Sequence, residues 1–252
     1  MGPSFSGVRP TCTFGAMINT NTLPQAWRRS HLLAFLSAVV LLSGCLTIEE
    51  NYTFKKDGSG TLEYVVDMSA MMEMMKGFEA MADKKDKKDE GPGNMDMAED
   101  MVKLKQIPGI KKVKVKKEKD GYVQRLSFRF ADLAALNKAL NTLMPDSTGN
   151  ETAFFTWDGN TLVRANNRHA TEMGDDMASD GSGGDSTFDA NTILQSMKYK
   201  YSFTFADAIA ATHTADGVNK EVPSDKQVKL DTDWSVIMKD PQALDLRIDL
   251  NR

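Results

Sequence analysis

Alternation of apolar and polar residues begins directly after residue 45 and predicts β-strands. One side of this first extended stretch is mostly apolar and consists of Leu46, Ile48, Glu50, Tyr52 and Phe54. The residues between them are polar, and period-two alternation of this kind is typical of a half-buried strand. The sequence DGSG at 57–60 predicts a turn, and 60–67 alternates again. We therefore expect a hairpin of residues 46–56 and 60–67.

The same pattern recurs further along the chain. Residues 110–119 and 122–130 alternate around the turn Asp120-Gly121, and residues 152–157 and 161–165 alternate around Asp158-Gly159-Asn160. Later strands are predicted at 198–205, 226–231, 233–238 and 244–250. These three hairpins indicate antiparallel pairing of neighbouring strands.

Helical spacing of apolar residues interrupts the strands at four places. The predicted helices are 69–84, 95–106, 131–143 and 189–197, with Ser69 as N-cap of the first and Pro145 after the third. Charged or Gly- and Ser-rich stretches at about 84–95 and 168–187 predict flexible loops. Together the elements predict an α+β fold, in which a curved antiparallel sheet of hairpins has helices packed on one face.

The segment before residue 45 has a different pattern. Residues 32–42 are apolar apart from Ser37, Arg28 and Arg29 precede them, and the small residues Ser43 and Gly44 follow. This order of a positive, an apolar and a small-residue region is typical of a secretory signal peptide. We expect residues 1–44 to be removed, with 1–16 as an over-extended start and Met17 as the alternative initiator. The single mature domain is then 45–252.

The last four residues of this pattern, Leu42-Ser43-Gly44-Cys45, resemble the lipobox of bacterial lipoproteins. The resemblance implies that Leu42, Ser43 and Gly44 are recognised by the lipoprotein signal peptidase. It also implies that Cys45 becomes the first mature residue and carries covalent diacylglycerol on its sulfur, with a third acyl chain, such as palmitate, on its amino group. Leu46, rather than Asp, follows the cysteine, and by analogy with enterobacterial sorting this predicts the outer membrane.

Charge and composition exclude several function classes. The chain has 31 basic and 35 acidic residues, and its precursor segment contains three arginines and no acid. The expected mature chain therefore has 28 basic and 35 acidic residues and a formal charge of −7. A net negative domain is not expected to bind nucleic acid. Because Cys45 is consumed by lipidation, the mature chain has no free thiol.

Residues for catalysis or for a bound metal are scarce. His169 and His213 are the only histidines of the expected mature chain, and no His-x-x-x-His or Glu-x-x-His spacing occurs. The sequence also has no Gly-x-Ser-x-Gly elbow, Walker loop or dinucleotide fingerprint. We therefore expect no enzyme activity, no metal centre and no cofactor other than the covalent diacylglycerol.

Methionine is the unusual residue of this chain, since nine of the sixteen lie between Met68 and Met101. The predicted helix at 69–84 has a candidate functional face, which consists of Met71, Met72, Met75 and Phe78. Three interpretations are open: a core-facing side of the helix, a pliable apolar surface for lipid or a partner, and a soft-metal site for Cu(I). The lysine-rich strand 111–117 is interpreted as a solvated, protected edge, or as a contact with anionic lipid.

The lipobox followed directly by a hairpin with a Gly-rich turn and then a helix, over residues 42–67, is similar to LppM-type lipoproteins. That resemblance implies an α+β lipid-binding domain. The function expected from the sequence is a non-enzymatic, lipid-anchored protein of the bacterial cell envelope. It would bind a lipid or an envelope protein at the membrane surface. The alternatives are a structural or assembly factor without a small ligand, and a methionine-rich Cu(I)-binding lipoprotein.

Overall fold

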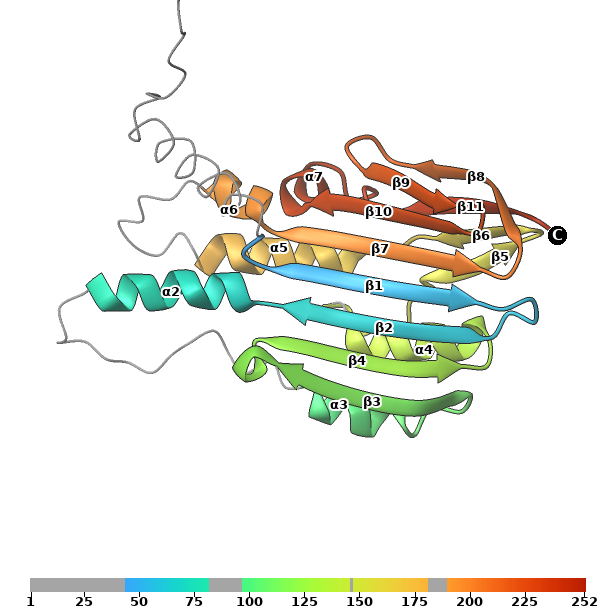
Figure 1. Ribbon diagram of the computed structural model, residues 1–252, viewed down its shortest axis with the longest axis horizontal. Coiled ribbons are helices and arrows are strands. Elements are labelled where there is room, and N and C mark those ends of the chain that lie inside the picture. Colours follow the sequence, from blue (N-terminus) through green and yellow to red (C-terminus); the bar gives the residue numbers. More distant parts are fainter. Residues whose placement is uncertain (1–43, 82–96, 146, 181–189) are drawn as a thin grey trace, which may run out of the picture. The chain divides into compact units, whose positions relative to one another are not determined.

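Two β-sheets form the centre of the structure, a computed structural model that describes residues 44–81, 97–145, 147–180 and 190–252 (Figure 1). The first sheet has seven strands in the order β3 (Ile110–Glu118), β4 (Val123–Phe130), β2 (Gly60–Asp67), β1 (Thr47–Phe54), β7 (Lys198–Phe205), β10 (Gln227–Asp233) and β9 (Asn219–Ser224). The second has four strands in the order β5 (Phe155–Asp158), β6 (Thr161–Arg164), β11 (Leu246–Asn251) and β8 (Ala208–Thr214).

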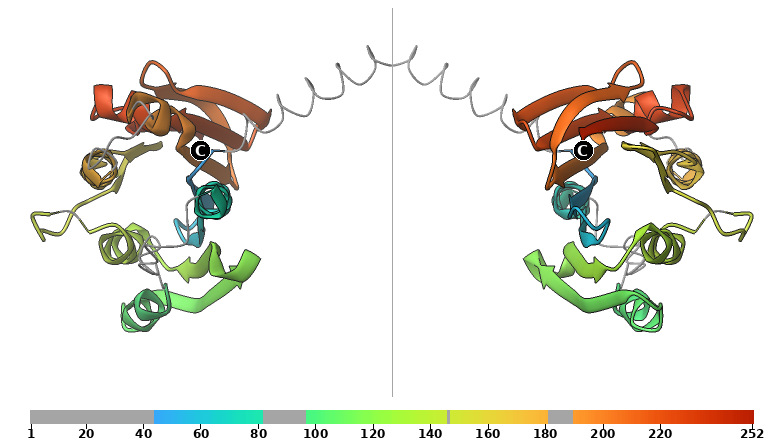
Figure 2. Two further views of the ribbon diagram at one scale, coloured as in Figure 1. Left: turned by 90° about the vertical axis from the view of Figure 1, so that its left-hand side faces the viewer. Right: turned by 90° about the vertical axis from the view of Figure 1, so that its right-hand side faces the viewer.

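The described helices are α2 (Ser69–Met81), α3 (Ala98–Leu104), α4 (Leu133–Leu143), α5 (Arg168–Asp180), α6 (Ala190–Ser196) and α7 (Trp234–Lys239), with a short 3-10 turn η1 (Lys119–Gly121). Helices α3, α4 and α5 lie on one side of the seven-stranded sheet, and among the described residues no helix covers its other face, called the free face below (Figures 1 and 2). The predicted α+β class is therefore confirmed.

The three predicted hairpins are all present. Thr47 pairs with Asp67 and Phe54 with Gly60 in the first hairpin, whose turn places Gly58 at a φ of 81°. Asp57 stabilises this turn, because its carboxylate accepts hydrogen bonds from the Ser59 amide at 3.0 Å and from the Ser59 hydroxyl at 2.7 Å. The apolar side predicted for β1 faces the interior, and Glu50 is buried with it.

The structure differs from the prediction in one strand pairing and in the number of sheets. Strand β1 pairs in parallel with β7, from Thr47 with Lys198 to Phe54 with Phe205, so the seven-stranded sheet is mixed. A hairpin pattern can predict only the pairing of strands that are neighbours in sequence. Strand β7 follows α6, which brings the chain back to the end of the sheet where β1 begins, so the two strands run in parallel. The prediction also contained a single sheet, whereas β5, β6, β8 and β11 form a second one.

Two further predictions were wrong. Residues 233–238 were predicted as a strand, but 234–238 belong to α7, because Asp233 caps the helix by accepting a hydrogen bond from the Val236 amide at 3.3 Å. Residues 168–180, predicted as part of a loop, form α5. The tryptophan of α7 holds α5 in place, since Trp234 Nε1 donates to the Ala170 carbonyl at 2.9 Å. The rest of that loop and the whole loop predicted at 84–95 lie outside the described residues.

Aromatic side chains fill the space between the two sheets. The ring of Tyr52 stacks on that of Phe203 at 5.0 Å between centroids and meets the edge of Phe155 at 5.0 Å. Phe54 stacks on Phe205 at 5.4 Å. All five rings are buried, so burial of aromatic surface is a main stabilising contribution between the sheets.

The chain divides into two compact units, 1–42 and 43–252, and all described residues belong to the second. None of the helices in the described part of the chain has both the length and the hydrophobicity needed to cross a bilayer. The predicted signal peptide lies outside the described residues, apart from Gly44, and remains a prediction.

Candidate functional site

The backbone of Cys45 is hydrogen-bonded to two other segments of the fold. Its amide donates a hydrogen bond to the Ser196 carbonyl at 2.8 Å, and its carbonyl accepts one from the Met71 amide at 3.2 Å. The next residue, Leu46, is 2 % exposed, and its carbonyl accepts a hydrogen bond from the Lys198 amide at 2.8 Å. No free spacer therefore separates Cys45 from the first strand, and its side chain is half-buried.

Gly44 has a structural reason to be glycine. A Cβ at this position would lie 2.5 Å from the Ser196 carbonyl oxygen and 3.1 Å from Cγ of Lys198. The first contact is with backbone and is too short for any side chain, so another residue here requires the chain to move. Leu42 and Ser43, the other residues predicted to be recognised by the signal peptidase, lie outside the described residues.

Helix α2 begins beside Cys45. Asp67 Oδ1 accepts hydrogen bonds from the amide of Ser69 at 2.9 Å and from its hydroxyl at 2.6 Å, and Lys119 Nζ donates to the same hydroxyl at 3.0 Å. These contacts fix the first turn of α2 to the end of the sheet. Beyond that turn, α2 continues past the ends of β1 and β7 (Figure 1).

The predicted methionine face is only partly described. Met71 packs against the hydrophobic core. The side chains of Met71 and Met72 are both half-buried. The side chains of Met75 and Phe78 lie outside the described residues, so the three interpretations of this face stay open. Within the described part of the chain, no group of three or more His, Cys, Asp or Glu side chains is placed to hold a metal ion.

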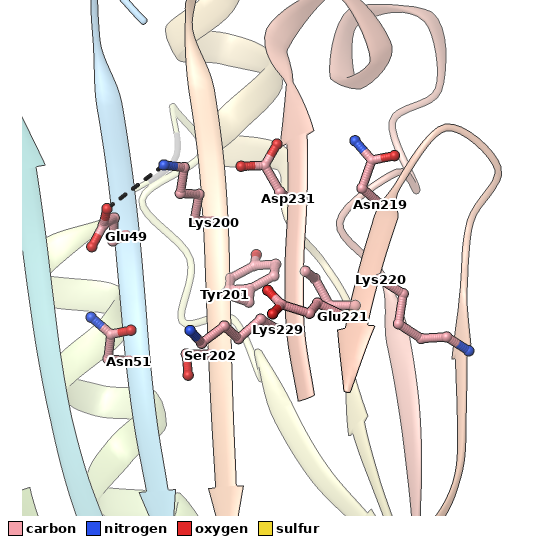
Figure 3. Close-up of a pocket in the computed structure, with 11 residues that line it drawn as sticks. Glu49, Asn51, Lys200, Tyr201, Ser202, Asn219, Lys220, Glu221, Lys229 and Asp231 are labelled. Atoms are coloured by element: carbon pink, nitrogen blue, oxygen red, sulfur yellow. Dashed lines mark ion pairs between the residues drawn. The ribbon is translucent and has the colours of Figure 1, made fainter. Parts of the chain in front are cut away.

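A groove of about 440 Å³ crosses the free face of the seven-stranded sheet over β1, β7, β10 and β9 (Figure 3). Its charged lining residues are Lys200, Lys220, Lys229, Glu49, Glu221 and Asp231. Lys200 Nζ lies 4.0 Å from a carboxylate oxygen of Glu49. Because positive and negative groups occur in equal number, the groove suits a polar surface of mixed charge rather than an acyl chain.

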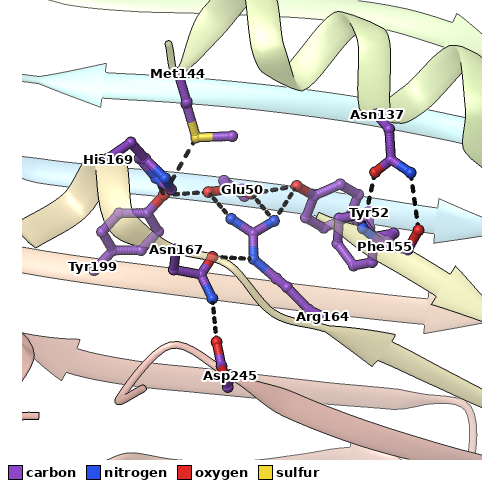
Figure 4. Close-up of polar contacts among 10 residues, drawn as sticks. All are labelled: Glu50, Tyr52, Asn137, Met144, Phe155, Arg164, Asn167, His169, Tyr199 and Asp245. Atoms are coloured by element: carbon purple, nitrogen blue, oxygen red, sulfur yellow. Dashed lines mark hydrogen bonds and ion pairs between the residues drawn. The ribbon is translucent and has the colours of Figure 1, made fainter. Parts of the chain in front are cut away.

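A buried polar network joins the two sheets (Figure 4). Arg164 of β6 makes two hydrogen bonds to the carboxylate of Glu50 of β1, with nitrogen–oxygen distances of 2.9 and 3.1 Å. Both side chains are 0 % exposed. The hydroxyls of Tyr52 and Tyr199 also donate to Glu50, so its carboxylate is saturated with donors.

Further contacts complete the network on the other side of Arg164. Its Nε donates to Asn167 Oδ1 at 2.9 Å, and Asn167 Nδ2 donates to Asp245 Oδ1 at 2.8 Å. His169 lies close by, with Nε2 at 3.3 Å from the Tyr199 hydroxyl. Residues from both sheets and from the segment that enters α5 thus meet at one buried guanidinium.

The electrostatics of this network favour fixed protonation states. Burial, and next to it the negative charge of Glu50, raises the pKa of Tyr52 and of Tyr199 well above the ordinary value. Burial alone would lower the pKa of Arg164, but Glu50 and the surrounding phenols outweigh it, and the pKa is raised. Each phenol therefore stays neutral and each donor keeps its proton.

The network is tightly packed among the residues that the structure describes. The crevice beside Tyr199 and Tyr201 has a volume of about 10 Å³, which is enough for one water molecule at most. With its charges paired and its groups buried, the network joins the two sheets. Sequence reasoning did not single out this network, although Glu50 on the apolar side of β1 was a signal for it.

The described residues define an α+β domain of two sheets whose first strand begins next to a cysteine. No protein-family model matches the chain, and no curated protein matches it. Among solved structures, the chain is similar to the NMR structure of the folded domain of the Mycobacterium tuberculosis protein LppM. The identity is 14 %, the match covers 83 % of this chain and 91 % of that chain, and the TM-score is 0.40. This is the type of lipoprotein that residues 42–67 resemble.

Proposed function

We propose that this chain is a non-enzymatic lipoprotein of the bacterial cell envelope, anchored through acyl chains on Cys45. The observation that carries the proposal is the lipobox Leu42-Ser43-Gly44-Cys45 at the end of a cationic and apolar segment. The geometry at Cys45 supports it. Its backbone is hydrogen-bonded to Ser196 and Met71, and strand β1 begins two residues further on, at Thr47.

The enclosed interior supports binding on the outside of the domain. The aromatic packing between the sheets leaves no room for an acyl chain beside Tyr52 and Phe203. The groove over β1, β7, β10 and β9 offers amide, ammonium and carboxylate groups instead. We therefore propose that the domain presents this face to a polar partner at the membrane surface, and we favour an envelope protein over an enclosed lipid.

The membrane that carries the protein is a finer part of the same proposal. Leu46 stands where the enterobacterial sorting signal for the inner membrane has Asp. Leu46 is also buried against the start of the sheet. We propose the outer membrane as the location, and separation of inner and outer membranes on a density gradient tests it.

The anchor is tested by replacing each cysteine in turn and growing the cells with radiolabelled palmitate. The unaltered protein and a Cys12→Ser control are expected to take up the label and to fractionate with membranes. The Cys45→Ser variant is expected to remain unlabelled and to keep the larger size of the precursor. If the Cys45→Ser protein has the same label, size and fractionation as the Cys12→Ser control, the proposal is wrong.

A further inference from the structure

The free face of the seven-stranded sheet continues beyond the groove onto β2, β4 and β3 (Figure 1). The strand registers place its side chains in rows across the sheet, because residues directly opposite each other share a face. One row consists of Lys111, Arg129, Thr61, Thr53 and Thr204. The next row consists of Lys114, Ser127, Glu63, Asn51 and Ser202. The last two of these also line the groove, so one continuous surface joins the groove to β3.

Two pairs of like charge lie opposite each other on β3 and β4 at this face. In one pair, Glu118 lies between Lys116 and Arg125, at 2.8 Å and 3.5 Å from their side-chain nitrogens. In the other, Lys111 lies directly opposite Arg129, and neither has an acidic partner among the described residues. Like charges in direct opposition destabilise a pair of strands. The second pair is therefore unfavourable for the fold as long as no anionic group binds there.

On β3 and β4, three exposed cations of this face have no acidic partner within the described part of the chain, and we call them the basic corner: Lys111, Lys114 and Arg129. Protection of the edge strand β3 does not explain the corner. The bulge between Lys111 and Lys114, with Lys112 at a φ of 56°, already interrupts this edge. Arg129 lies on β4, which is paired on both sides and needs no such protection.

We infer that the basic corner binds an acidic surface of the protein partner that occupies the groove. The inference rests on the proposed function, which places a partner on this face. The groove has positive and negative groups in equal number, whereas the corner offers cations alone, so carboxylates of the partner complement it. Binding of a carboxylate would also offset the repulsion between Lys111 and Arg129.

Anionic lipid is the less favoured occupant of the corner because of distance. Thr53, in the row of Lys111, follows the start of β1 at Thr47 by six residues, or about 20 Å of strand. The corner therefore lies at the end of the sheet opposite Cys45 (Figure 1). The field of headgroups around Cys45 is screened within about 8 Å at physiological salt. A protein that stands beside the domain can reach both the groove and the corner.

A water-soluble carbodiimide tests the corner, because it joins lysine amines directly to carboxylates that contact them. It is added to membranes of cells that make the full-length, lipidated protein, and mass spectrometry identifies the lysines joined to another protein. Arg129→Gln removes one cation of the corner but keeps both reactive lysines. Arg247→Gln, on the second sheet, is the matched control. In parallel, labelling of Lys111 and Lys114 by an amine reagent is compared in detergent and in vesicles of phosphatidylglycerol.

The expected result is that Lys111 and Lys114 are joined to Asp or Glu residues of an envelope protein. The yield should fall about threefold in Arg129→Gln, as for the loss of one exposed ion pair, and stay unchanged in Arg247→Gln. If the groove lysine Lys229 is joined to a partner but the corner is not, or if Arg129→Gln has no effect, the inference is wrong and the partner at the groove stands. If vesicles alone protect the corner from the amine reagent, the corner binds lipid and the inference is wrong. If no lysine of this face is joined to another protein, the proposed partner fails and the inference fails with it.

Discussion

At the scale of single residues, Arg164 and Glu50 show how a polar pair is kept in a closed core. Each charge is fully enclosed, and each has more than one hydrogen-bond partner, including Tyr52, Tyr199 and Asn167. A buried pair of this kind gains little net stability over apolar residues of the same size, because both charges lose their hydration. We infer that it contributes specificity, because Arg164 of β6 bonds to Glu50 and Tyr52 of β1 in this register.

Removal of one partner is therefore expected to be far more damaging than removal of both. Arg164→Met leaves the Glu50 carboxylate buried without its cation and should lower the free energy of unfolding by about 3–5 kcal/mol. The double variant Glu50→Gln with Arg164→Met should recover part of this loss. Urea unfolding followed by circular dichroism measures both.

A matched control for this prediction is the surface pair of Arg247 and Asp158, whose side chains are 2.8 Å apart and about half exposed or more. Arg247→Met should change the free energy of unfolding little, because exposed ion pairs are screened by water. If Arg164→Met and Arg247→Met lower the free energy of unfolding equally, burial is not the reason why breaking the Arg164–Glu50 pair destabilises the domain.

At the scale of elements, the sequence predicted what is local. Alternation in β1, β2, β4 and β7 located those strands because each has one buried face, and Pro145 marked the end of α4. The same reasoning placed Cys45 directly before the first strand. Its neighbours in the fold, Ser196 and Met71, could not be predicted, because hydrogen bonds between distant backbone segments leave no pattern in the sequence.

The elements that were missed depend on tertiary contacts. Helix α5 has Asp and Gly residues that favour a loop, and its stability comes from packing against α7. Strand β9 is exposed along its whole length, so it has no apolar alternation for a pattern to detect. The buried network was also missed because it depends on a tertiary contact, since Glu50 and Arg164 are 114 positions apart.

Packing of α5 on α7 gives a prediction at this scale. A Cβ on Gly174 would lie 2.5 Å from Sδ of Met238 and 2.7 Å from Cδ1 of Trp234. Gly174→Ala should therefore lower the free energy of unfolding by about 1–3 kcal/mol, the usual cost of an overpacked contact. Urea unfolding measures the loss, and tryptophan fluorescence reports whether the indole of Trp234 moves.

Gly77 in α2 is the matched control, because a Cβ there meets nothing within 4 Å. Gly77→Ala removes a flexible residue from a helix interior and should stabilise α2 by up to about 1 kcal/mol. If Gly174→Ala is as well tolerated as Gly77→Ala, the close packing of α5 on α7 does not hold α5 in place.

At the scale of the whole domain, the proposed attachment at Cys45 defines two ends. Strand β1 (Thr47–Phe54) begins two residues after Cys45 and ends two residues before Lys56, and its eight residues span about 26 Å. The beginnings of β1 and β7, the end of β2 and η1 lie at the cysteine end, whereas the C-terminus and the β1–β2 turn lie at the other (Figure 1). A domain attached without a spacer should therefore stand on the membrane with its cysteine end down and its free sheet face to the side.

Labelling of lysines with a water-soluble amine reagent tests this orientation. Lys119 lies at the cysteine end and Lys56 at the far end, and their side chains are 61 % and 78 % exposed. In membranes opened so that the reagent reaches both surfaces, Lys119 should react more slowly than in detergent, because the bilayer surface covers it. Lys56 should react at the same rate in membranes and in detergent. Insertion of a Gly-Ser linker between Cys45 and Leu46 should keep the protein on the membrane but restore the reactivity of Lys119. Protection of Lys56 instead, or protection of Lys119 that survives the linker, would show that the absence of a spacer does not orient the domain.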